Sequence, residues 1–147
     1  NLSELLLIHF EDDSLGGGAL SGNADHPWAI NDIAACGGSS KGITAGVNSD
    51  GQKKGVDSVS SLTITVPAGA TSMSYFYSYP TALDSGDDFH VSVNGVLMKS
   101  YETGDGASCA SECISVSPGN NVKFTCKSSG LNEICSIDQI QFYGLIR

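Results

Sequence analysis

Acidic side chains gather at three separate places in the sequence, and together they could bind a hard cation. The first place is Glu11-Asp12-Asp13, directly after Phe10 and the first apolar run. The second is Asp84 with Asp87-Asp88, before the apolar run that begins at Phe89. The third is Asp138, near the C-terminal end. Ca²⁺ takes six to eight oxygen ligands, and carboxylates at strand ends can supply several of them. We therefore expect a structural calcium ion. The alternative is a set of solvated aspartates in turns.

Asp138 gives the most specific reason to expect a neutralising partner. It lies between Ile137 and Ile140, and a charge among apolar side chains is costly unless it is paired or hydrogen-bonded. If the first and last strands of the fold pair with each other, Glu11 and Asp138 come close together. With that pairing, the acidic residues at the two ends of the chain could meet.

The single tryptophan lies in a polar segment that could bind a sugar. In "NADHPWAIN", Trp28 has Asp25 and Asn31 as neighbours. A sugar site needs a flat ring for stacking and a few polar groups that fix the hydroxyls, so these residues form a candidate ligand site. The alternative is that Trp28 fills one end of the hydrophobic core.

The segment "SMSYFYSY" places large side chains on alternate positions. Met73, Tyr75, Tyr77 and Tyr79 share one face of an extended strand, and the other face carries Phe76 among serines. The Met/Tyr face is expected to pack on the core, with the hydroxyls bonded at its rim. In the alternative, Tyr75, Tyr77 and Phe76 contribute to a sugar-binding surface.

No pattern in the sequence predicts catalysis. The three histidines lie in unrelated contexts, and the chain has no Gly-x-Ser-x-Gly or His-Glu-x-x-His motif. Asp87 and Asp88 are adjacent, so in a strand they point to opposite faces and cannot flank one scissile bond. We expect a protein that is not an enzyme.

The five cysteines predict disulfides. They are Cys36, Cys109, Cys113, Cys126 and Cys135, and their spacing is not the Cys-x-x-Cys of zinc or thioredoxin sites. Two local bridges, Cys109–Cys113 and Cys126–Cys135, are expected in an oxidising compartment, although four cysteines allow three pairings. Cys36 then remains as a free thiol or pairs with a segment outside this chain.

Composition excludes some classes of partner. The chain of 147 residues has 7 basic and 16 acidic side chains, a net charge of −9. Nucleic acid is disfavoured because binding phosphates requires clustered Lys and Arg. No apolar run is long enough for membrane insertion. The abundance of turn-forming residues and the cysteines favour a secreted, extracellular or cell-surface protein.

The elements that must position these residues are short strands. Apolar or alternating runs occur at 5–10, 62–66, 72–79, 89–101, 113–126 and 134–143. Asn94-Gly95 predicts a hairpin, and a second hairpin is expected around Pro118-Gly119-Asn120. The pattern predicts one all-β domain over residues 1–147, an antiparallel β-sandwich of jelly-roll type.

Several of these segments resemble the MAM-like jelly-roll modules of secreted proteins, which are close in type to carbohydrate-binding modules. The resemblance is carried by "HFEDD", the following tryptophan, "LTITVPAGATSMSYFYSY", "DDFHVSVNG" and "SIDQIQFYG". It implies that Glu11, Asp13, Asp88 and Asp138 hold a structural Ca²⁺. The chain departs from the pattern at Gln139, where an acidic residue is usual, and in its C-terminal cysteines.

The sequence therefore predicts an extracellular, non-catalytic binding module with a structural calcium ion. The resemblance implies a carbohydrate or glycoprotein ligand. The alternative is a protein-interaction or adhesion module of a larger secreted or cell-surface protein, and such a module could associate with itself. An exposed aromatic strip would favour sugar, and a broad apolar patch would favour protein.

Overall fold

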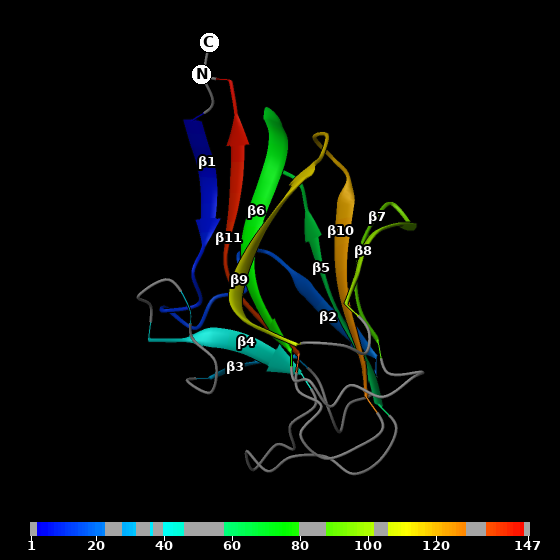
Figure 1. Cartoon of the computed structure of the whole chain (residues 1–147). Coiled ribbons are helices and arrows are strands. Elements are labelled where there is room, and N and C mark those ends of the chain that lie inside the picture. The colour runs from blue at the N-terminus through cyan, green and yellow to red at the C-terminus, as the bar shows by residue number, and fades with distance from the viewer. Residues whose placement is uncertain are drawn as a thin grey trace.

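The fold consists of two antiparallel sheets packed face to face (Figure 1). The computed structural model describes residues 3–22, 28–31, 36, 40–45, 58–79, 88–101, 106–128 and 135–145. These residues form strands, turns and connections, and none of them is helical, so no helix that could cross a membrane occurs among them. The predicted all-β sandwich is confirmed.

The first sheet contains six strands. Its order is β3 (Ala29–Asn31), β4 (Gly42–Ala45), β11 (Cys135–Gly144), β6 (Ala70–Tyr79) and β9 (Ala107–Ser115), and β1 (Ser3–Ile8) also pairs with β11. Ile8 of β1 lies opposite Ile140 of β11. This register shows that the first and last strands pair, which was the condition for bringing Glu11 near Asp138.

The second sheet contains five strands. Its order is β2 (Ala19–Gly22), β5 (Ser58–Thr65), β10 (Asn121–Ser128), β7 (Asp88–Val93) and β8 (Val96–Tyr101). β7 and β8 form the predicted hairpin. Its turn residues Asn94 and Gly95 have φ angles of 49° and 81°, and such positive values at both positions favour the Asn-Gly pair.

Alternation along the strands builds the core between the two sheets. Inward-facing side chains come from both sheets. On β10, for example, the buried Val122, Phe124 and Cys126 alternate with polar outward neighbours. The largest fully buried side chains are Trp28, Tyr75, Phe10, Phe89, Phe124, Phe142, Ile43, Leu62, Ile64, Met73 and Ile137. The prediction that the Met/Tyr face of β6 packs inward is confirmed at Met73 and Tyr75.

The second predicted hairpin is wrong. β9 pairs with β6 in the six-stranded sheet, whereas β10 pairs with β5 and β7 in the five-stranded sheet. The Pro118-Gly119 turn is present, with the Asn120 amide donating to the Ser117 carbonyl at 3.1 Å, but it carries the chain from one sheet to the other. An alternating pattern on both sides of a turn is compatible with either connection.

The disulfides are partly as predicted. Cys126–Cys135 is present and joins the two sheets, but the second bridge is Cys36–Cys109, and Cys113 is a free, exposed thiol. The predicted Cys109–Cys113 bridge is therefore wrong. Four residues of an extended strand span about 13 Å, whereas bridged Cα atoms lie about 4–7 Å apart.

We predict that Cys113→Ser changes the free energy of unfolding by less than about 0.5 kcal/mol, because this thiol is exposed. Cys109→Ser should cost much more, since opening a bridge across 73 residues removes about 4 kcal/mol in the chain-entropy account. Denaturant unfolding of both variants checks this. Peptide mapping without reduction should recover Cys36 linked to Cys109, and a Cys109–Cys113 peptide would contradict the assignment.

Candidate functional site

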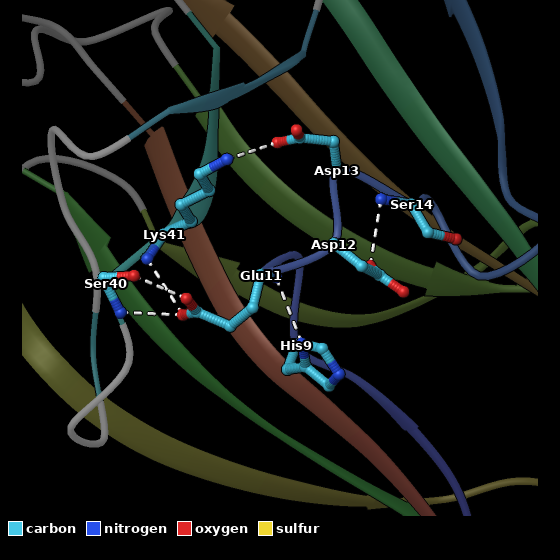
Figure 2. A network of polar contacts seen from close by, with 7 residues as sticks. All are labelled: His9, Glu11, Asp12, Asp13, Ser14, Ser40 and Lys41. Atoms are coloured by element: carbon cyan, nitrogen blue, oxygen red, sulfur yellow. Dashed lines mark hydrogen bonds and ion pairs between the residues drawn. The ribbon is translucent and has the colours of Figure 1, made fainter.

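Glu11 organises a polar network where the chain leaves β1 (Figure 2). Its carboxylate accepts hydrogen bonds from the backbone amides of Ser40 at 2.7 Å and Lys41 at 3.0 Å, and from the Ser40 hydroxyl. Ser40 and Lys41 immediately precede β4. The half-buried carboxylate thus ties the end of β1 to the start of another strand of the same sheet.

Asp13 extends the network through an ion pair. The Lys41 Nζ lies 2.7 Å from Asp13 Oδ1, and both side chains are exposed. The turn that carries Asp13 is held by its own amide, which donates to the Phe10 carbonyl at 3.1 Å. Asp12 instead accepts from the Ser14 amide. Carboxylates here are matched by backbone N–H groups and an ammonium.

Asp138 is fully buried at an irregularity in β11. Its Oδ2 accepts from the Cys36 amide and its Oδ1 from the Gln139 amide, each at 2.8 Å. Gln139 has a φ of 48° and donates from Nε2 to the Cys36 carbonyl at 3.0 Å. N–H donors therefore satisfy the buried carboxylate, as its apolar neighbours led us to expect.

The predicted calcium ligands are partly brought together. Glu11 and Asp13 follow β1 and both contact Lys41. Asp138 lies in β11 and bonds to Cys36 and Gln139 instead. Asp88 begins β7 in the other sheet, and its side chain lies outside the described residues. No group of three or more His, Cys, Asp or Glu side chains suited to a metal occurs among the residues described. In this arrangement a cation would have to displace the donors of Ser40 and Lys41. The calcium ion stays a prediction.

Trp28 and Tyr75 lie in the core. Each side chain is 1% exposed, and the Trp28 Nε1 donates to the Ser60 carbonyl at 3.1 Å. The Trp28 ring packs on Phe89, with centroids 6.0 Å apart. The structure thus shows the core-packing alternative for both residues. Their assignment to the predicted ligand site is corrected, because neither ring offers a surface for stacking.

Tyr77, Tyr79 and Tyr101 form a stacked group beside the core. Tyr77 and Tyr101 have centroids 4.2 Å apart, and Tyr79 stacks on both. The Tyr75 and Tyr101 hydroxyls bond at 2.9 Å, and burial raises the pKa of both. Tyr77 is thus half-buried by its own neighbours. The prediction that the hydroxyls of this tyrosine face find partners is confirmed for Tyr75.

The remaining predicted ligand residues are not brought into one site. Phe76 is half-buried on the outer face of the six-stranded sheet. Asn31 ends β3, but its side chain lies outside the described residues, and so does Asp25. In the described part of the chain, the structure therefore gathers no aromatic sugar-binding surface from this set.

Sequence reasoning missed a groove on the outer face of the five-stranded sheet. It crosses β5, β10, β7 and β8 and has a volume of about 540 Å³. Its lining residues are Thr63, His90, Ser92, Asn94, Gly95, Leu97, Asn121, Lys123 and Thr125. Asn94 and Gly95 belong to the β7–β8 turn, and the other lining residues lie in strands or at their ends. The alternation that turns side chains outward is visible in the sequence, but the groove can be recognised only when the strand order is known.

Several proteins of known structure have a similar fold. No family model and no curated protein sequence matches the chain significantly. The chain is similar to the K1 cleaved adhesin domain of Lys-gingipain from Porphyromonas gingivalis W83, with a TM-score of 0.71 and 8% identity over 96% of this chain and 98% of that one.

Two solved structures of carbohydrate-binding modules are also similar. TmCBM61 in complex with β-1,4-galactotriose has a TM-score of 0.54 and 13% identity, covering 95% of this chain and 94% of that one. The CBM22-1 xylan-binding domain of Xyn10C from Paenibacillus barcinonensis has a TM-score of 0.51 and 13% identity, covering 99% and 96%. The chain has the β-sandwich fold that these adhesin and carbohydrate-binding domains share, whereas the MAM-like resemblance stays a prediction.

We predict that Glu11→Gln lowers the free energy of unfolding by about 1–2 kcal/mol, because it weakens hydrogen bonds to a charged acceptor. The loss should be present in excess chelator, since the partners of Glu11 in the structure belong to the protein. Asp12→Asn, a neighbouring exposed change, should cost under about 0.5 kcal/mol. A loss confined to calcium would instead support the predicted ion.

The buried tyrosine pair predicts a loss of stability at alkaline pH. A folded-state pKa above the ordinary value of 10 leaves the native chain with more bound protons than the unfolded chain, so this contribution is complete below pH 10 and declines above it. Denaturant unfolding at pH 8 and at a pH above 10 measures the decline. It should be smaller in the Tyr75→Phe/Tyr101→Phe double variant, and an unchanged decline would contradict the assignment.

Proposed function

We propose that this chain is an extracellular, non-catalytic binding module that holds a carbohydrate in the groove of the five-stranded sheet. The groove is the observation that carries the proposal. Its volume of about 540 Å³ lies in the range of pockets that take small ligands, about 300–1,000 Å³. The sandwich fold shared with adhesin and carbohydrate-binding domains and the two disulfides are compatible with this role.

The register of the sheet brings hydroxyl and nitrogen groups onto the groove floor in rows. Lys123 of β10 lies between Thr63 of β5 and Ser92 of β7, and Ser92 pairs with Leu97 of β8. Thr125 and His90 pair in the next row. Sugars present hydroxyls at regular intervals along a chain, so a line of hydroxyl, ammonium and imidazole groups provides matched donors and acceptors.

One end of the groove is fixed by backbone contacts. The Asn121 amide donates to the Asn94 side-chain carbonyl at 2.7 Å, and the Asn94 amide donates to the Asn121 carbonyl at 2.9 Å. The β7–β8 turn is therefore clamped onto β10. A preformed wall lowers the ordering cost of binding. Leu97, which is 55% exposed, supplies an apolar contact for the face of a sugar ring.

The edge strand β8 favours a second candidate function, protein interaction. Val96, Leu97 and Met98 are 63%, 55% and 40% exposed, and β8 is the last strand in the order of its sheet. Edge strands offer unpaired backbone groups to another chain, and adjacent apolar side chains add area for contact. Val96 and Met98 do not line the groove, so the two functions can be separated by substitution.

We predict that Ser92→Phe reduces binding to polysaccharides at least tenfold, because a ring at the centre of the groove occupies the volume that a sugar needs. A panel of soluble neutral and acidic polysaccharides, measured by affinity electrophoresis and titration calorimetry, tests this. Ser115→Phe is the matched control, since Ser115 is exposed on the other sheet and should leave binding unchanged.

A second control separates sugar from protein partners. Val96→Ser should leave polysaccharide binding unchanged, because Val96 lies outside the groove. Polysaccharide binding that is insensitive to Ser92→Phe would move the site elsewhere. The protein-interaction function would be favoured by two results together: the chain binds no polysaccharide of the panel, and it associates with another chain in a way that Val96→Ser abolishes.

A further inference from the structure

We propose that the groove selects acidic glycans, with a uronate carboxylate or a sulfate ester of the sugar placed beside Lys123. This inference rests on the proposed function and names the class of carbohydrate that the same site takes. It is carried by the distribution of charge over the groove and by the position of Lys123 in the sheet.

The groove is a cationic region in an acidic protein. The chain has 16 acidic and 7 basic residues, yet the lining set contains Lys123 and His90, and none of the nine described lining residues is Asp or Glu. Lys123 carries the formal charge among these described lining residues, with His counted as neutral. The local charge is thus opposite in sign to the net charge, and a neutral sugar alone would not require it.

Lys123 occupies the middle of the groove floor. It is exposed on β10, the central strand of the five, and it pairs with Thr63 on one side and Ser92 on the other. The ion pairs that join described residues are Lys41–Asp13 and Lys99–Glu112, so the Lys123 ammonium has no carboxylate partner within the described part of the chain. An anionic ligand group would supply one.

Lys123 also has suitable neighbours for the rest of such a sugar. The hydroxyls of Thr63 and Ser92 flank it in the same row, and Thr125 with His90 forms the adjacent row. A carboxylate or sulfate on the ammonium forms a charge-assisted bond, about twice as strong as a neutral one. The remaining hydroxyls of the sugar then face neutral donors and acceptors.

The net charge of −9 does not prevent this recognition. At physiological ionic strength the screening length is about 8 Å, so acidic side chains on the far sheet act weakly on a ligand in the groove. Lys123 acts at contact distance, where screening is least effective. Long-range repulsion would slow association, but the contact itself determines which sugars remain bound.

The test compares three oligosaccharides by titration calorimetry: tetragalacturonate with carboxylates, a κ-carrageenan tetrasaccharide with sulfates, and neutral β-1,4-galactotetraose. The wild-type chain should bind at least one acidic probe at least tenfold more tightly than the neutral one. Lys123→Gln should remove that preference by lowering the affinity for the acidic probe to the level of the affinity for the neutral one. The acidic probes distinguish carboxylate from sulfate as the recognised group.

Lys127→Gln is the matched control, because Lys127 is exposed on the same strand, carries the same charge and lies outside the groove. It should leave all three affinities within about twofold. The inference would be overturned if the chain bound the neutral probe as tightly as the acidic ones, or if a preference for acidic probes survived Lys123→Gln. Either result would leave the proposed carbohydrate function standing. Binding of no probe, and of no polysaccharide in the wider panel, would overturn both.

Discussion

The structure depends on the last strand, β11, which pairs with two different strands, β4 and β1, along one of its edges. Cys135–Ile137 of β11 pairs with β4, whereas Ile140–Gly144 pairs with β1, and β6 runs along the other edge. Asp138 and Gln139 lie where the partner changes. Backbone groups at such a junction lack a regular ladder. The buried Asp138 carboxylate and the Gln139 amide bond to Cys36 there, and Glu11 bonds to Ser40 and Lys41 beside it.

Those features that depend on local pattern were predictable from sequence. Alternation in the strand with Met73 and Tyr75 identified its buried face, and Asn94-Gly95 identified a hairpin through its backbone preference. The burial of Asp138 between isoleucines predicted that it needs partners. Each inference used residues within a few positions of one another, where covalent geometry fixes which side chains share a face.

The features that could not be predicted from the sequence depend on contacts between distant strands. Proximity in sequence favoured Cys109–Cys113, but extended backbone separates those residues and brings Cys109 to Cys36. The turn at Pro118 looks the same whether it joins neighbours in one sheet or crosses between sheets. The groove belongs to four strands whose order, β5-β10-β7-β8, is not sequential, so Thr63, Lys123 and Ser92 become neighbours only through pairing.

The same constraint explains why the two polar regions have different roles. Around β11, carboxylates accept hydrogen bonds from backbone amides at an interrupted edge, so their partners are supplied by the fold and their chemistry is largely used within it. On the five-stranded sheet the ladders that β10 forms with β5 and β7 are continuous, so the backbone groups of β10 are already satisfied by both neighbours. Its outward side chains are therefore not required to complete the backbone hydrogen bonding, and they can contact an external ligand. The face of β10 and its neighbours thus provides the surface for recognition, while the irregular edge uses its acidic residues to join segments of the six-stranded sheet.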